Sequence, residues 1–262
     1  MFLIFASKVA SLSGNHRYQK QSEALRELWE KCDPESYRAA LDRSNVVVVS
    51  PEDELVEKGI AVEINSMIRR MTVNIANESE AQIADSIVEI KQVAQKYKLS
   101  GDTAESLVST VMCQKGIVSE SKIMASHVRD TGSRVTEQNT RCRYMTVCSS
   151  DGVVICKLCG KTDGVDYDNK QVVEIKKRMN RLFEFIPVYE KVQLHCYMQL
   201  TGFTKALLIQ EYSGERSETY MAFDSAFWDS VVVRLQSGLK LVQKAIEGDE
   251  PSQDKILATP KA

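Results

Sequence analysis

The stretch from Lys161 to Lys176 constrains the fold of this chain more than any other. It begins with a turn that carries Asp163 next to a glycine and, after a short hairpin, ends in a strand that closes with Glu174-Ile175-Lys176. Side chains alternate between the two faces of a strand, so Glu174 and Lys176 share one face while Ile175 points to the core. Two carboxylates that can share a divalent cation, with an ammonium group beside them, predict a site for phosphodiester hydrolysis.

Further hairpins and helices surround this stretch in the second half of the chain. Turn residues predict hairpins centred on 149–152, 168–170 and 213–215. Helical periodicity predicts helices over 119–130, 187–200 and 224–246. We therefore expect an α/β (α+β) fold in which helices flank a central mixed β-sheet.

The first half of the chain is predicted to be mostly helical. Helical patterns occur over 7–12, 18–32, 53–71, 80–98 and 102–113. Ser50-Pro51 is a strong helix start, because serine caps the first turn and proline fits its first position. The β-branched run over 46–49 predicts a short buried strand or a loop packed on the core.

Charge and cysteine content narrow the class of protein. The net charge of −2 gives no overall field that would attract nucleic acid, but basic residues gather at 129–143 and 176–181, on either side of the acidic turn. No apolar run approaches the roughly 20 residues needed to cross a bilayer, so we expect no membrane partner. Seven cysteines without framework spacing favour an intracellular, reducing compartment.

Four segments resemble the PD-(D/E)xK nuclease superfamily. The spacing D-x10-E-x-K from Asp163 to Lys176 lies within the range of that superfamily, although Thr162 replaces the proline of its first motif. Three other segments resemble its lambda-exonuclease and YqaJ-type viral recombinase branch: KGIVSE at 115–120 followed by TGSRV at 131–135, PVYEKVQLHCYM at 187–198 followed by TG at 201–202, and IFASKV at 4–9.

This resemblance implies a domain organisation. A restriction-endonuclease-like core at about 112–247 would belong to a single nuclease domain over 1–247, with a helical insert at about 46–111. The polar composition from 248 to 262 predicts a disordered tail.

The resemblance also implies a metal site. Asp163 and Glu174 would bind Mg²⁺, for which Mn²⁺ can substitute, because these hard cations prefer oxygen ligands. The carbonyl oxygen of Ile175 and the carboxylate of Glu120 would complete the ligand set. Glu63 is the alternative to Glu120, because it follows an identical Lys-Gly-Ile sequence.

Further roles follow for residues around the metal. Lys176 would position or polarise the attacking water, and Gln193 would orient that water or a ligand carboxylate, so both count with Asp163 and Glu174 as catalytic. Ser7 would contact a DNA phosphate, and the two basic clusters supply Arg134 and Lys177 as further DNA-binding residues.

The implied activity is a metal-dependent exonuclease that hydrolyses linear double-stranded DNA in viral recombination and repair, with 5′→3′ polarity carried by the resemblance alone. The branch also implies a homo-oligomer, a single-strand annealing protein as partner, and the cytoplasm or nucleus of a host cell. In that branch an arginine upstream of the Ala-Ser element grips the 5′ phosphate, whereas the first basic residues here are Lys8 and Arg17. We therefore expect no strict dependence on a 5′-phosphorylated end.

Three alternatives to this reading stay open. A structure-specific or nicking endonuclease would use the same catalytic atoms, and a catalytically silent nucleic-acid-binding scaffold would keep the fold alone. Cys156 and Cys159 could bind zinc or an iron–sulfur cluster, but their positions on a predicted strand place them on different faces. We expect both thiols to serve as small buried hydrophobic groups.

Overall fold

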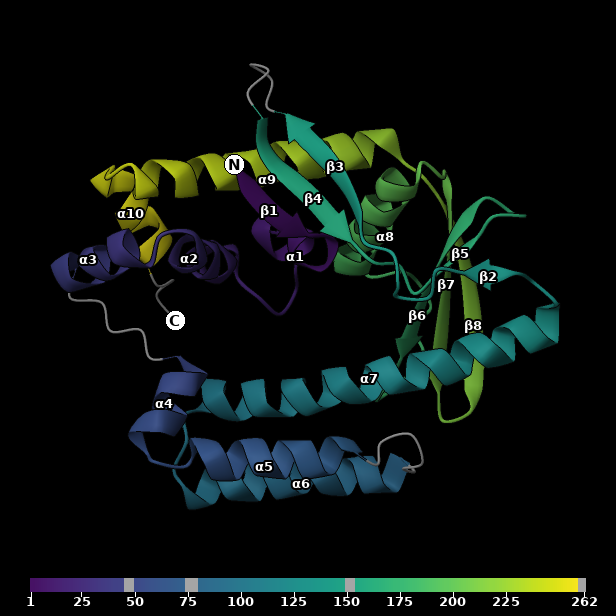
Figure 1. Cartoon of the computed structure of the whole chain (residues 1–262), viewed down its shortest axis with the longest axis horizontal. Coiled ribbons are helices and arrows are strands. Elements are labelled where there is room, and N and C mark those ends of the chain that lie inside the picture. The colour runs from purple at the N-terminus through teal and green to yellow at the C-terminus, as the bar shows by residue number, and fades with distance from the viewer. Residues whose placement is uncertain (45–49, 74–79, 149–153, 259–262) are drawn as a thin grey trace.

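The computed structural model describes residues 1–44, 50–73, 80–148 and 154–258, and it contains two β-sheets among helices (Figure 1). The predicted α+β class is confirmed. The strands form a three-stranded and a five-stranded sheet in place of one central sheet, and each sheet contains a parallel pair. No helix within the described ranges is long and apolar enough to cross a membrane.

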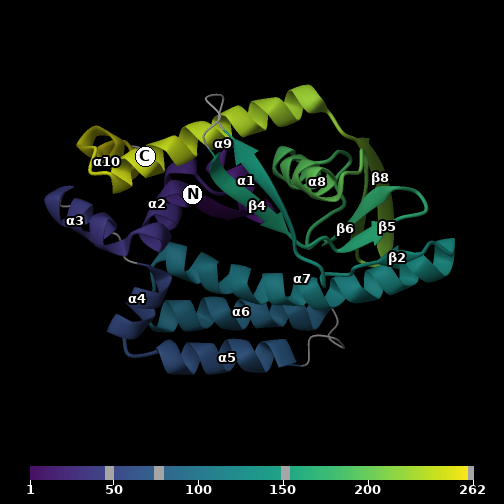
Figure 2. The same ribbon diagram turned by 45° about the horizontal axis from the view of Figure 1, so that its top comes forward.

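Helices cover both faces of the larger sheet. On one face, Val172 and Leu208 pack into a core shared with α8 (Val188–Thr201), and on the other Val173 packs against α7 (Gly101–Thr131). The turned view of Figure 2 shows the sheet between these two helices. Five more helices, α1, α2, α3, α9 and α10, surround the α8 side: Ala6–Leu12, Gln21–Cys32, Pro34–Ser44, Ser225–Ile246 and Glu250–Leu257.

The larger sheet contains the stretch 161–176. Its strands β2, β5, β6, β7 and β8 lie in that order and span Val135–Thr136, Gly164–Asp166, Gln171–Lys177, Lys205–Tyr212 and Glu215–Ala222. β6 runs parallel to β7 along its whole length, but its ladder with β5 extends only from Gln171 to Val173. The β5 side of residues 174–177 is therefore free of strand pairing in the described structure, next to the turn at Asp163.

The smaller sheet contains the strand that ends directly before the stretch 161–176. Its strands β1, β4 and β3 lie in that order and span Phe2–Phe5, Val154–Gly160 and Arg143–Cys148. A Cβ atom on Gly160 would lie 2.9 Å from Tyr197 Cε1 and 3.1 Å from Ala6 Cβ, so α8 and α1 pack directly on the end of β4. Glycine permits this approach three residues before Asp163. Cys156 and Cys159 of β4 are both buried.

A helical arm stands on the outer side of α7 (Figure 1). It comprises α4, α5 and α6: Pro51–Glu57, Ala61–Val73 and Glu80–Lys96. The arm has its own small core, in which Ile64 and Ile90 are fully buried against Val111 of α7. Its helices lie within the range 46–111, and the identification of that range as an insert into a nuclease domain stays a prediction.

Several helix boundaries differ from the prediction. The helix predicted over 53–71 is two helices, because Gly59 adopts a φ of +70° that ends the first. The helices predicted over 102–113 and 119–130 are the single helix α7, which continues through Gly116. A mid-helix glycine costs about 1 kcal/mol, and burial of Val111 in the arm and Met124 on the sheet outweighs it. The strand or loop predicted over 46–49 lies outside the described residues.

One helix had not been predicted, and one prediction from local composition was wrong. Pro34 opens α3, since proline fits the first position of a helix. The tail from 248 was expected to be disordered, but 250–257 form α10. Its Ile256 and Leu257 are buried in the main core, and Gln253 Nε2 donates a 2.8 Å hydrogen bond to the carbonyl of Ala245.

Candidate active site

Asp163 occupies the unpaired side of β6. Its Oδ2 accepts a 2.8 Å hydrogen bond from the backbone N–H of Ile175, where a neighbouring strand would otherwise pair. Asn139 Nδ2 donates to Asp163 Oδ1 at 3.3 Å. The N–H and C=O of one strand residue point to the same side, so the carbonyl oxygen of Ile175 also faces Asp163. The Ile175 side chain is buried with Ile123 and Met124 of α7, as the alternation predicts.

Glu174 and Lys176 lie together on the other face of β6, toward α8. Lys176 Nζ donates to Glu174 Oε1 at 2.6 Å. Glu174 is 2% exposed, and its Oε2 has no hydrogen-bond partner among the described residues. Buried polar atoms are nearly always partnered in proteins, so this oxygen fits a site that receives a cation.

The buried charges perturb one another. Burial, and then the carboxylate of Asp163, raise the pKa of Glu174 well above its ordinary value. Burial alone would lower the pKa of Lys176, but the charges of Glu174 and Asp163 outweigh it and raise that pKa. Lys176 is therefore a permanent cation beside carboxyl groups that compete for protons.

Glu120, on α7, belongs to the same group of charges. Burial raises the pKa of Glu120 to about 7, the Asp163 carboxylate adds to the rise, and Lys176 opposes it. Glu120 in turn contributes to the raised pKa of Glu174. The alternative residue, Glu63, lies in α5 of the helical arm, where its Oε2 accepts a 2.8 Å hydrogen bond from the Tyr97 hydroxyl. The structure thus brings Glu120 to Asp163 and leaves Glu63 bonded within the arm.

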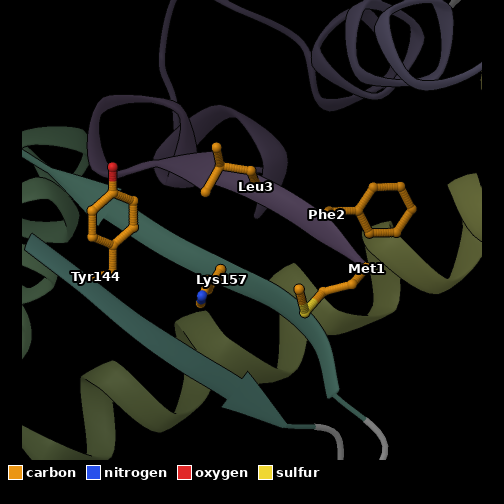
Figure 3. A pocket seen from close by; sticks show the side chains of 5 residues that line it. All are labelled: Met1, Phe2, Leu3, Tyr144 and Lys157. Carbon is orange, nitrogen blue, oxygen red and sulfur yellow. The ribbon is translucent and has the colours of Figure 1, made fainter.

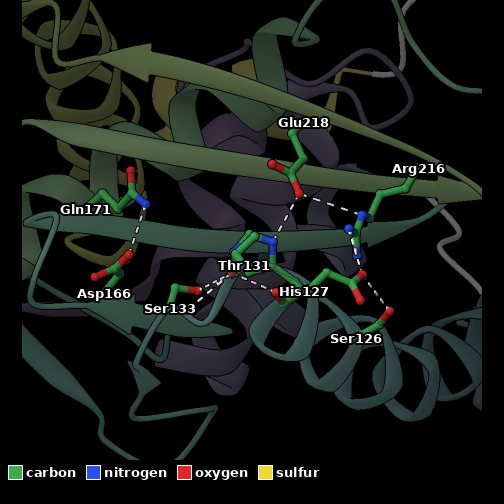
Figure 4. Close-up of polar contacts among 9 residues, drawn as sticks. Ser126, His127, Thr131, Ser133, Asp166, Gln171, Arg216 and Glu218 are labelled. Atoms are coloured by element: carbon green, nitrogen blue, oxygen red, sulfur yellow. Dashed lines mark hydrogen bonds and ion pairs between the residues drawn. The ribbon is translucent and has the colours of Figure 1, made fainter.

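The far end of α7 is fixed to β8 by polar and charged side chains (Figure 4). The buried His127 has its Nδ1 3.0 Å from Glu218 Oε1, and Arg216 donates to Asp130 Oδ2 at 3.0 Å. Arg216 Nε also lies 3.6 Å from Glu218 Oε1. His127 is about two helical turns after Glu120 and on the same side of the helix, so these contacts help to hold Glu120 against the sheet.

Gln193 and Tyr197 extend the site from α8. Gln193 Nε2 donates to the Tyr197 hydroxyl at 3.1 Å, across one turn of the helix. Burial raises the pKa of Tyr197 well above its ordinary value, and the carboxylate of Glu174 adds to the rise. The phenol therefore stays protonated close to Glu174. Tyr197 was not predicted as a site residue, although Gln and Tyr four residues apart share one helix face.

The three residues expected to bind DNA come from three different parts of the chain. Ser7 is exposed in the first turn of α1. Arg134 is also exposed and forms a two-pronged ion pair with Asp168, at 3.0 and 3.1 Å. Lys177 Nζ donates to Glu211 Oε1 at 2.8 Å. A phosphate at either cation would have to compete with a carboxylate that is already there.

The group of carboxyls fits a divalent cation by charge and by chemistry. Within the described residues no three His, Cys, Asp or Glu side chains are spaced to hold a metal ion as they stand. Glu120, Asp163 and Glu174 with Lys176 bring three carboxylates and one ammonium, a net charge of −2 when all are ionised. A dication would neutralise this charge with the oxygen ligands that Mg²⁺ prefers.

Two hollows in the described structure lie away from these residues. One of about 380 Å³ opens on the smaller sheet and is lined by Met1, Phe2, Leu3, Tyr144 and Lys157 (Figure 3). Another of about 120 Å³ lies between β1 and α2. None of the candidate site residues lines either of these two hollows.

Comparisons with known proteins give limited likeness. No family model matches the chain, and no curated protein matches it. Among solved structures, SSO0001 is similar over 69% of this chain and 86% of its own, with 15% sequence identity and a TM-score of 0.40. The alkaline exonuclease LHK-Exo from Laribacter hongkongensis is similar over 64% of this chain and 93% of its own, with 15% identity and a TM-score of 0.41. Its complex with dAMP has a TM-score of 0.38.

Proposed function

We propose that this chain is a metal-dependent deoxyribonuclease that hydrolyses linear double-stranded DNA as an exonuclease. The observation that carries the proposal is the buried Glu174, whose unpartnered oxygen lies in a group of charges with Asp163, Glu120 and the ammonium of Lys176. Burying several like charges in a protein core is costly, and such perturbed groups cluster at functional sites.

The residues present suit phosphodiester hydrolysis. Mg²⁺, or Mn²⁺ in its place, would be held by Glu120, Asp163, Glu174 and the carbonyl of Ile175, and would supply Lewis acidity toward the phosphate and a more acidic water. Lys176, permanently charged, donates to the attacking water or to a phosphoryl oxygen and offsets the negative charge that develops there.

The α8 residues complete this arrangement. The Gln193 amide has a second N–H and an oxygen beyond its bond to Tyr197, so it can orient the water or the Glu174 carboxylate. Ser7, Arg134 and Lys177 contact the DNA backbone. The two cations bind a phosphate by exchanging their present carboxylate partners for it.

The finer assignments belong to the same proposal. Cleavage runs 5′→3′ on one strand during viral recombination and repair, in the reducing cytoplasm or nucleus of a host cell. The protein works as a homo-oligomer and passes the exposed strand to a single-strand annealing protein.

Labelled linear duplex and closed circular plasmid, incubated with Mg²⁺ or Mn²⁺, test the proposal in one gel. We expect the linear DNA to be shortened from its ends, the circle to persist, and Lys176→Ala to be inactive with an unchanged far-UV circular dichroism spectrum. Cleavage of the circle would replace the exonuclease by a nicking or structure-specific endonuclease. Binding without cleavage would favour the silent scaffold, and full activity of Lys176→Ala would refute the catalytic assignment.

A further inference from the structure

A buried ion pair joins the end of β6 to α8. Arg178, the residue after β6, donates to both carboxylate oxygens of Glu190 in the first turn of α8, at 2.6 and 2.7 Å. The side chain of Arg178 is 9% exposed and that of Glu190 is 4% exposed. Two parallel N–H to oxygen bonds fix both the distance and the relative orientation of the two groups.

The pair also fastens the loop between β6 and α8. Arg178 Nε donates to the side-chain oxygen of the fully buried Gln210 on β7, at 2.8 Å. Gln210 Nε2 donates to the carbonyl of Phe183 at 3.0 Å, and the Phe183 N–H donates back to Gln210 Oε1 at 3.3 Å. The guanidinium carbon of Arg178 lies 4.3 Å from the centre of the Phe183 ring. Arg178, Phe183, Glu190 and Gln210 form a clasp that joins the loop between β6 and α8 to both α8 and β7.

The clasp connects the two elements that carry the reacting groups. Arg178 follows Lys176 by two residues and lies directly after the end of β6. Glu190 precedes Gln193 by three residues, which places the two side chains on one face of α8, about one turn apart. The ion pair therefore fixes where α8 lies along β6 and how α8 is rotated about its own axis. It does so about one helical turn from the amide of Gln193.

Stability alone does not account for this arrangement. Removing two charges from water is so costly that a well-packed apolar pair of similar volume is often as stable or more stable. What an apolar pair does not provide is direction, because dispersion contacts tolerate small shifts and rotations that a two-pronged ion pair does not.

We propose that Arg178 and Glu190 are positioning residues that hold Gln193 and Tyr197 of α8 in register with Glu174 and Lys176. This inference rests on the proposed nuclease function. The negative charge of Glu190 also acts on Lys176 and favours its charged form.

Three variants test the inference: Glu190→Gln, the double variant Arg178→Met with Glu190→Leu, and Arg43→Met as a matched control. Arg43 pairs with Asp254 at 2.9 Å and joins α3 to α10, far along the chain from the site. Each protein is assayed for kcat and KM on linear duplex DNA with Mg²⁺, for thermal stability, and for amide hydrogen exchange over 188–198.

We expect Glu190→Gln to lower kcat by about tenfold to a hundredfold, the loss typical of misplaced catalytic groups, with little change in KM and faster exchange over 188–198. The double variant should regain thermal stability but not kcat, and Arg43→Met should keep kcat. Recovery of kcat together with stability in the double variant would overturn the inference, as would full kcat in Glu190→Gln. Inactive wild-type protein in both Mg²⁺ and Mn²⁺ would instead overturn the proposed function, so the two failures are distinguishable.

Discussion

Replacing Glu120 by glutamine should change the way in which metal affinity depends on pH. In the folded protein, burial and then the charge of Asp163 raise the pKa of Glu120 to about 7. A metal ion needs the ionised carboxylate, so protons compete with the metal at this residue throughout the neutral range. Glutamine keeps the size and the carbonyl oxygen of the side chain but has no proton to lose.

The size of the effect follows from that pKa. With a pKa of about 7, about a tenth of Glu120 is ionised at pH 6 and about nine-tenths at pH 8. Its contribution to metal binding therefore increases the affinity about tenfold across this interval, or about 1.4 kcal/mol. The raised pKa of Glu174 adds a further dependence that the variant retains.

The assay is Mn²⁺ binding by calorimetry at pH 6, 7 and 8, without DNA. We expect the affinity of the wild-type protein to rise at least tenfold over the series, and the rise in Glu120→Gln to be about tenfold smaller. Equal pH dependence in the two proteins would refute the placement of Glu120 in the ligand set. It would leave Glu174 as the residue that titrates.

The raised pKa of Glu120 also predicts how the stability of the metal-free protein depends on pH. A carboxyl whose pKa is raised on folding contributes stability that is present below its unfolded-state value of 4.5 and lost as the pH rises through about 7. Glu120→Gln removes this loss. Without metal, the variant should therefore unfold at a higher temperature than the wild type at pH 8 and at the same temperature near pH 4, as measured by calorimetry. A lower unfolding temperature at pH 8 would contradict the sign of the shift.

Two other substitutions test neighbouring parts of the structure. Glu63→Ala should leave the cleavage rate within about twofold of the wild type, because surface substitutions away from special features have small effects; a loss as large as that of Glu120→Ala would restore Glu63 as the third acid. Gly164→Ala should destabilise the protein by about 1–3 kcal/mol in urea titrations, since its Cβ would lie 2.3 Å from Val135 Cγ1 and 2.7 Å from Met124 Cε. Unchanged stability would show that α7 can move away from β5.

The sequence predicted those features of the site that depend on local spacing. Strand alternation placed Glu174 and Lys176 together and Ile175 in the core, and the glycine after Asp163 indicated a turn beside that strand. Turn residues likewise predicted the hairpin that contains β6, because their backbone preferences act over a few residues. Such signals are independent of how distant segments pack.

Features that depend on long-range packing were not predictable in this way. The choice between Glu120 and Glu63 could not be made from two identical local motifs, since only the path of α7 across the sheet brings one of them to Asp163. The ion pair between Arg178 and Glu190 was not predicted, because Arg178 follows a strand and Glu190 lies in a helix 12 residues away. No local pattern indicates a contact between two such segments. The helix α10 was not predicted, because most of its residues are polar and its buried apolar residues, Ile256 and Leu257, lie at its end.

Metal binding should also stabilise the folded protein, since folding is what brings the site together. In the unfolded chain the carboxylates of Glu120, Asp163 and Glu174 are separated by the flexible backbone, so a dication has little affinity for them. A ligand that binds only the folded state adds about 2.7 kcal/mol at a concentration of 100 times its Kd. At pH 8, Mn²⁺ should raise the unfolding temperature of the wild type, and a chelator should reverse the rise. Asp163→Asn keeps the oxygen that accepts from the Ile175 N–H but loses the charge, so its unfolding temperature should not respond to Mn²⁺. An equal rise in both proteins would show that the cation binds elsewhere on the chain.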